Sequence, residues 1–173
     1  AIESFSKLLE LYPDDTISTN YLGLIYAILE EQDKAIKYLE MAFRLQKNIL
    51  SCSSLAGSYQ GAGLFQKARD VYEDYLKNIS DNPDIHRYLG WSYLTEGKFD
   101  LAQAEADKAF LMDPKNNDNF LLKGDIFYLQ DDFAGAESEY QKLLEAKPES
   151  YAFGARSQLA MIDLRRGNFE KAI

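Results

Sequence analysis

Apolar side chains in residues 83–116 recur at helical spacing in two runs that a short turn separates. The positions that define the pattern are Leu89, Gly90, Tyr93, Gly97, Phe99, Ala102, Ala109 and Pro114. The first three share one face of a helix, because residues three or four apart lie on the same side of it. Gly97 falls where the first helix ends, and Pro114 falls where the second one ends. The stretch therefore predicts a hairpin of two helices.

The same pattern recurs along the whole chain. Units begin near Thr16, Ile49, Pro83 and Asn117, at intervals of 33, 34 and 34 residues. An alanine holds the same place in the second helix of every unit: Ala1, Ala35, Ala68, Ala102, Ala136 and Ala172, at intervals of 34, 33, 34, 34 and 36 residues. A fixed period of this length is the signature of a repeat protein. We predict a half unit, four whole units and a second half unit.

Three places depart from the repeating pattern. The turn at residues 30–33 lacks glycine and an aromatic residue. Lys47 stands where three other units close with proline, so we expect a shorter connection at Lys47. After Pro148 the interval grows to 36 residues. This predicts either two extra loop residues or a next helix that is lengthened at its start through residues 149–151.

The pattern resembles the tetratricopeptide repeat (TPR) family, whose repeat of roughly 34 residues carries these residue types at these offsets. The resemblance implies an all-α, right-handed α-solenoid of antiparallel helix pairs, with about ten helices and a truncated last one. Residues 1–173 would form a single array. Its parts would be a half repeat at 1–15, full repeats at 16–48, 49–82, 83–116 and 117–152, and a partial repeat at 153–173. Repeat arrays normally carry polar caps at their ends, so the uncapped ends suggest a piece of a longer protein.

Small residues mark the places where the two helices of each unit cross. Glycine inside a helix costs roughly 1 kcal/mol relative to alanine. The glycines at Gly23, Gly90 and Gly124 therefore call for a packing reason, and close approach of the two backbones supplies one. We predict that these glycines face the recurring alanines of the second helices.

Composition narrows the function classes. An apolar fraction of 46% and a mean hydropathy of −0.37 are typical of a soluble, folded chain, and no apolar run is long enough to cross a membrane. The net charge of −9 repels phosphate backbones and anionic lipid surfaces, which argues against nucleic acid and membrane insertion. One cysteine and one histidine exclude an internal disulfide and leave a Cys/His metal site without ligands. These counts fit a reducing cytoplasm, but a cysteine-poor periplasmic protein would look the same, so localisation stays open.

The residues with the most reactive side chains lack the partners that chemistry would need. His86 and Cys52 occupy the same helix-packing position of successive units, so we interpret both as packing residues. The paired acidic residues at 14–15, 30–31 and 131–132 lie at turns, where helix capping and solvation account for them. We predict no catalytic residues, no metal and no cofactor.

In the TPR family the first helices line a concave groove, and the resemblance implies which side chains face it here. The candidate groove residues are Asn20, Leu24, Ile28, Arg87, Trp91, Leu94, Leu121, Asp125, Tyr128 and Met161. Trp and Arg are frequent anchors of interfaces, so we interpret Trp91, with Arg87, Leu121 and Tyr128, as a peptide anchor. The alternative is that these side chains pack against the neighbouring first helix as ordinary core.

The predicted function is a non-enzymatic scaffold that binds a peptide or helix of an unidentified partner protein in the groove, mainly by apolar burial. One subclass of the family binds acidic tails through a clamp of Lys, Asn and Arg side chains. The matching positions here hold Asn20, Leu24, Ser54, Asp84 and Tyr88, which disfavours that mode. Two alternatives stay open: a regulatory or substrate-docking region of a larger enzyme, and self-association through the uncapped end helices.

Overall fold

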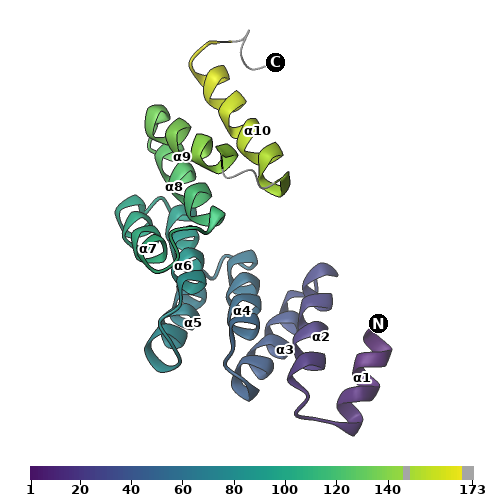
Figure 1. The fold of residues 1–173 in the computed structure, drawn as a ribbon. Helices are drawn as coiled ribbons and strands as arrows, with labels where there is room; N and C mark the ends of the chain where they lie inside the picture. Colours follow the sequence, from purple (N-terminus) through teal and green to yellow (C-terminus); the bar gives the residue numbers. More distant parts are fainter. Residues whose placement is uncertain (146–148, 169–173) are drawn as a thin grey trace. The chain divides into compact units, whose positions relative to one another are not determined.

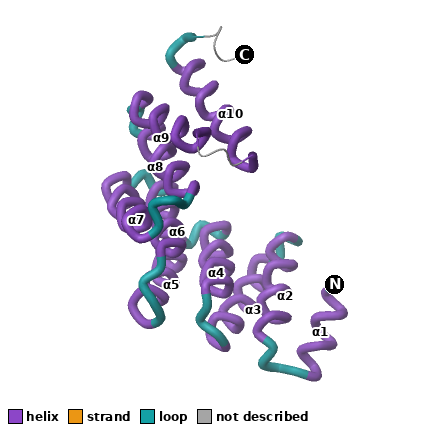
Figure 2. The backbone as a smooth tube through the Cα atoms, viewed as in Figure 1, coloured by secondary structure: helices purple, strands orange, loops and turns teal. Residues whose placement is uncertain are grey.

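A computed structural model describes residues 1–145 and 149–168, and every regular element in these ranges is an α-helix. The helices are α1 (Ile2–Leu11), α2 (Thr16–Ile28), α3 (Gln32–Leu45), α4 (Ile49–Gly61), α5 (Phe65–Asn78), α6 (Pro83–Thr95), α7 (Phe99–Met112), α8 (Asn117–Leu129), α9 (Phe133–Glu145) and α10 (Glu149–Arg165). Figures 1 and 2 show the helices and the short loops that join them. The chain is an all-α helical repeat, as its periodicity predicted.

Two compact units make up the chain, residues 1–88 and residues 89–173. In the first unit, α2 packs on α3 and α4 packs on α5, while α3 also contacts α4 and α1 contacts α2 (Figure 1). In the second unit, α8 packs on α9, and α10 contacts both of them. Contacts within a unit therefore join the two helices of a hairpin, as in α2 with α3, and also join one hairpin to the next, as in α3 with α4.

The predicted close approach of helices occurs at the small residues. A Cβ atom added at Gly23 would lie 3.2 Å from the Ala35 carbonyl oxygen, and one added at Gly90 would lie 3.5 Å from the Ala102 carbonyl oxygen. The alanines Ala35, Ala68, Ala102 and Ala136 have no exposed surface. Their burial confirms that the recurring alanines sit at the helix crossings.

The turns that follow α2, α4, α6, α8 and α10 share one backbone geometry. The residue in the left-handed region is Glu30, Gly63, Gly97, Asp131 or Gly167, with φ between 60° and 77°. In the turn at Gly97, the Gly97 amide donates to the Leu94 carbonyl and the Lys98 amide donates to the Tyr93 carbonyl, and the other four turns make the same two bonds. This is the Schellman arrangement, which satisfies the last carbonyls of a helix. The turn at residues 30–33 adopts it without glycine.

Polar side chains cap the N-termini of α2 and α4, each of which is the first helix of its repeat. The Asp15 carboxylate accepts a hydrogen bond from the Ser18 amide at 3.0 Å and caps α2. Asn48 and Ser51 form a reciprocal capping box at the start of α4. The connection that contains Lys47 has three residues, against four between α5 and α6 and four between α7 and α8. The expected shorter connection is confirmed.

The helix after Pro148 is lengthened at its start, since α10 begins at Glu149. This matches the second of the two sequence-based alternatives. Pro148, Phe169, Ala172 and the predicted truncated last helix lie outside the described residues.

Candidate functional site

A pocket of about 330 Å³ opens in the second unit, where three helices converge. Its lining residues are Trp91, Leu94 and Thr95 from α6, Asp125, Tyr128 and Leu129 from α8, and Gln158 from α10. We call it the Trp91 pocket. Trp91, Leu94, Tyr128 and Leu129 contribute apolar or aromatic surface, and Gln158 contributes an aliphatic stem. Asp125 is the one charged residue among the described lining residues. The arrangement combines an apolar wall with a single carboxylate.

Core packing holds the Trp91 side chain in place. Trp91 is half-buried and packs against a cluster formed by Leu94, Ala102, Ala106, Leu122 and Ile126. Within this cluster, Ala102 and Ala106 come from α7, and Leu122 and Ile126 come from α8. The ring therefore contributes to the core on one side and to the pocket on the other.

Asp125 is held by two hydrogen bonds from aromatic side chains. The Tyr140 hydroxyl donates to Asp125 Oδ1 at 2.7 Å, and the Trp91 indole N–H also donates to the carboxylate. Burial raises the pKa of Asp125 above its usual value, and the two hydrogen bonds oppose that shift. A carboxylate has about four lone-pair sites, so two donors leave it with further accepting capacity.

Gly124 is what allows Tyr140 to reach this carboxylate. The Tyr140 ring is fully buried and lies against the Gly124 backbone, so that an added Cβ atom would be 2.8 Å from Tyr140 Cδ1. The same burial, together with the Asp125 charge, raises the pKa of Tyr140 and keeps its hydroxyl protonated as a donor. The glycine that the sequence marks as a helix crossing thus also shapes the pocket.

Tyr128 forms an edge of the Trp91 pocket that is stabilised from two sides. Its ring centroid lies 5.9 Å from that of Phe133 on α9. The Arg165 guanidinium lies 5.4 Å from the Tyr128 ring centroid and also pairs with Asp131 at 3.5 Å. A guanidinium over an aromatic face is a favourable cation–π contact.

The structure brings four of the ten candidate groove residues together in this pocket: Trp91, Leu94, Asp125 and Tyr128. Leu121 instead packs against the cluster of Ala136, Tyr140 and Ile162. Met161 on α10 is 48% exposed. Thr95 and Leu129 fall on groove-facing positions of the repeat but were not among the ten candidates, and Gln158 carries no sequence signal that would have identified it.

The candidates in the first unit have different environments. Asn20 is buried, and its amide donates to the Ser54 hydroxyl at 3.3 Å, which links α2 to α4. Arg87 is only 3% exposed and pairs with Asp84. Leu24 is half-buried, whereas Ile28 is 80% exposed. Asn20 therefore packs against the neighbouring first helix.

The remaining reactive side chains are engaged in packing. His86 Nε2 lies 2.6 Å from Asp81 Oδ1 and is buried. Burial raises the pKa of the Cys52 thiol to about 12, which keeps it uncharged. No group of three or more His, Cys, Asp or Glu side chains suited to a metal ion occurs among the described residues. Within the same residues, no helix combines the length and apolar character needed to cross a membrane.

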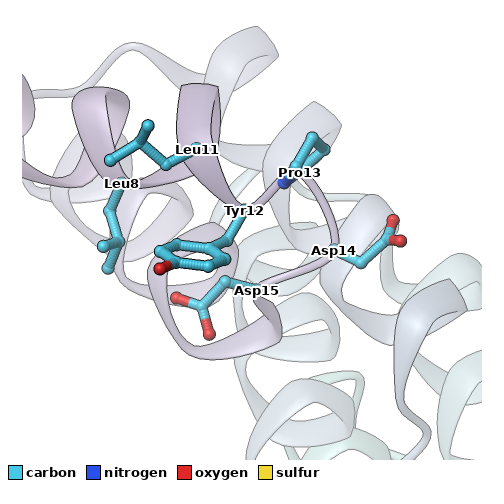
Figure 3. A pocket seen from close by; sticks show the side chains of 6 residues that line it. All are labelled: Leu8, Leu11, Tyr12, Pro13, Asp14 and Asp15. Atoms are coloured by element: carbon cyan, nitrogen blue, oxygen red, sulfur yellow. The ribbon is translucent and has the colours of Figure 1, made fainter.

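A second concavity, of about 570 Å³, lies at the end of α1. It is lined by Leu8, Leu11, Tyr12, Pro13, Asp14 and Asp15. Figure 3 shows the Tyr12 ring and the Leu8 and Asp15 side chains directed toward one space, with the Asp14 carboxylate pointing away. One helix and the loop that follows it supply all of these residues, whereas three helices shape the Trp91 pocket. The Trp91 pocket is the better-formed site.

Comparison with known proteins places this fold in a family. The family described as "Tetratricopeptide repeat" matches residues 1–47 and 89–151. The BBSome complex member BBS4 of Bos taurus is 26% identical over 179 residues, which cover 98% of this chain and 34% of that protein. Tetratricopeptide repeat protein 1 of Schizosaccharomyces pombe is 22% identical over 161 residues, which cover 84% of this chain and 15% of that protein. The chain thus spans about a third of the first relative and less of the second.

Solved structures show the same fold at low sequence identity. The APC/C hetero-tetramer Cut9–Hcn1 superposes with a TM-score of 0.81 at 14% identity, over 97% of this chain and 34% of that chain. YrrB, described as a TPR protein with an unusual peptide-binding site, superposes with a TM-score of 0.63 at 19% identity, over 100% of this chain and 89% of that chain. Since the family match covers more than half of the residues, and the helices, turns and crossings agree with it, the chain belongs to the tetratricopeptide repeat family.

Proposed function

We propose that this chain binds a peptide or helix of a partner protein on the surface formed by α6, α8 and α10, with the Trp91 pocket as the anchor site. TPR folds generally serve as scaffolds for protein–protein interaction. The choice of the Trp91 pocket as the anchor site is supported by its lining, which brings together Trp91, Leu94, Tyr128 and Leu129. Its proposed role is binding, because the lining combines apolar and aromatic side chains with one charged residue, Asp125.

The pocket has the properties of an interface anchor. Aromatic side chains that are held rigidly before binding lose little conformational entropy when a partner arrives. Trp91 is held by the core cluster on which it packs and by its hydrogen bond to Asp125, and Tyr128 is held by Phe133 and Arg165. A volume of about 330 Å³ suits one inserted side chain, with the rest of the peptide on the surrounding surface.

Two of the similar proteins have descriptions that support a role in protein binding. The bovine relative is named as a member of a complex, and the YrrB structure is described as having a peptide-binding site. Those descriptions concern those proteins. For this chain they support a search for a peptide partner.

A single tryptophan makes the proposal directly testable. Because Trp91 is the only tryptophan in the sequence, its fluorescence reports on the pocket alone. Random twelve-residue peptides displayed on phage would be selected on the 173-residue chain, and the enriched peptides titrated while Trp91 emission is followed. We expect a saturable change in intensity or wavelength.

Two leucine variants provide the matched comparison. Leu129 lines the pocket and is 50% exposed, whereas Leu101 on α7 is 48% exposed and does not line it. We expect Leu129→Ser to weaken peptide binding by roughly tenfold, since losing a well-buried anchor contact costs more than 1 kcal/mol, and Leu101→Ser to leave it unchanged. Equal affinities for the two variants would show that peptides bind elsewhere.

A further inference from the structure

We propose that the Trp91 pocket receives a basic side chain, Lys or Arg, from the partner peptide, with the Asp125 carboxylate as its acceptor. This inference rests on the proposed function, because it names the chemistry of the residue that the same pocket binds. It adds a charged contact to a site that the sequence presents as mainly apolar.

Charge complementarity carries the proposal. Asp125 is the one charged residue among the described residues that line the pocket, and the whole chain has a net charge of −9. A basic residue on an approaching peptide is attracted first by the overall field and then by the single carboxylate. An acidic or neutral side chain would gain neither contribution.

The Asp125 carboxylate has the capacity to accept the extra donor. It takes one hydrogen bond from Tyr140 and one from Trp91, which fix its orientation and leave lone pairs available. Because Leu94, Leu129 and the aromatic rings surround it, a hydrogen bond to a cation there is less weakened by water and salt than one on an open surface.

The pocket walls suit the stem of a basic side chain. Lys and Arg bury their aliphatic stems on apolar surface while the charged end reaches a polar group. Trp91 and Tyr128 add aromatic surface beside the carboxylate, and cations bind favourably to such rings.

The test compares matched peptides on matched variants. Peptides enriched from the displayed library on the wild-type chain would be synthesised with a dye, and their affinities measured by fluorescence anisotropy. We expect the enriched sequences to share a Lys or Arg at one position. Replacing that residue by norleucine, which keeps the apolar stem, is expected to weaken binding to the wild type by about tenfold, as a charge-assisted hydrogen bond requires.

Asp125→Asn is the corresponding change in the protein. Asparagine still offers an oxygen to Tyr140 and Trp91 but removes the charge, so it is expected to lower the affinity for the basic peptide about tenfold and to leave the norleucine peptide unaffected. Asp100→Asn, on α7 and outside the pocket lining, makes the same change in net charge and should bind both peptides as the wild type does. Thermal unfolding of each variant would confirm that it is folded.

The outcomes distinguish a failure of this inference alone from a failure of the proposed function. Enriched peptides that depend on Leu129 but lack a basic residue, or that bind Asp125→Asn as tightly as the wild type, would overturn this inference and leave the proposed function standing. The norleucine comparison uses only the wild-type chain, so it decides the question even if Asp125→Asn is unstable. Binding that ignores Leu129→Ser, or a selection that enriches no peptide, would overturn the proposed function and this inference together.

Discussion

Replacing Gly124 by alanine is expected to destabilise the second unit, although alanine is the better helix former. A Cβ atom at this position would lie 2.8 Å from Tyr140 Cδ1 and 2.9 Å from Tyr140 Cζ. The Tyr140 ring is fully buried and bonded to Asp125, so it cannot yield without disturbing the core. Overpacking of a core costs about 1–3 kcal/mol, and weakening a hydrogen bond to a charged acceptor costs about 1.5–3 kcal/mol.

Helix propensity opposes these costs by roughly 1 kcal/mol. The net effect of Gly124→Ala is therefore a loss of about 1.5–5 kcal/mol in the free energy of unfolding. For a chain of this length, that loss corresponds to a fall of about 3–20 °C in the midpoint of thermal unfolding. Circular dichroism during heating and urea titration would measure both quantities.

Gly154 on α10 provides the matched control in the same unit. No atom lies within 4 Å of a Cβ atom added there. Gly154→Ala is therefore expected to raise the free energy of unfolding by up to about 1 kcal/mol. The same substitution should thus have opposite signs at the two sites, and a Gly124→Ala variant as stable as Gly154→Ala would refute the close-packing argument.

Three further predictions concern a turn, the pocket carboxylate and the cysteine. Glu30→Gly should stabilise the first unit by about 0.5–1 kcal/mol, because φ of +60° is strained for any residue but glycine. Glu31→Gly, where φ is −84°, should not stabilise it. Both variants would be measured by urea unfolding, and equal changes in stability would show that the turn carries no strain. Burial raises the pKa of Asp125 in the folded state, so its contribution to stability is fully present below its usual pKa of 3.8 and is lost as pH rises through the folded value. The stability of the wild type relative to Asp125→Asn should therefore fall over that pH range in urea titrations, and a constant difference would contradict the assignment. Because its pKa is raised to about 12, Cys52 should react with iodoacetamide at pH 8 far more slowly in the folded chain than in urea, and equal rates would show that the thiol is accessible.

The Glu30 turn shows where local residue preferences and tertiary packing differ. Glycine at Gly63 and Gly97 signals a left-handed residue, and the sequence correctly places turns there. Glu30 and Asp131 lack that signal but adopt the same φ, because the helices on either side pack through Gly23 and Ala35 or through Gly124 and Tyr140. Helix packing therefore holds non-glycine residues in a backbone conformation that they do not favour.

The candidate site shows the same division. The repeat offsets identify which residues belong to first helices, and four of the candidate groove residues do line the Trp91 pocket. The offsets treat Asn20 and Arg87 as equivalent to Leu121, yet Asn20 bonds to Ser54, Arg87 pairs with Asp84, and Leu121 joins an apolar cluster. Each environment depends on side chains supplied by other residues, which vary from repeat to repeat.

By itself, the sequence determined the helical hairpins, their order and their crossing points, because helix period, capping residues and small side chains act over a few residues or recur at a fixed interval. Only the tertiary structure decided that Gln158 joins the pocket, that Asp125 is held between Tyr140 and Trp91, and that Asn20 is buried. The physical reason is that burial and hydrogen-bond partners are properties of several helices packed together, and no interval along one helix encodes which neighbouring side chains will be there.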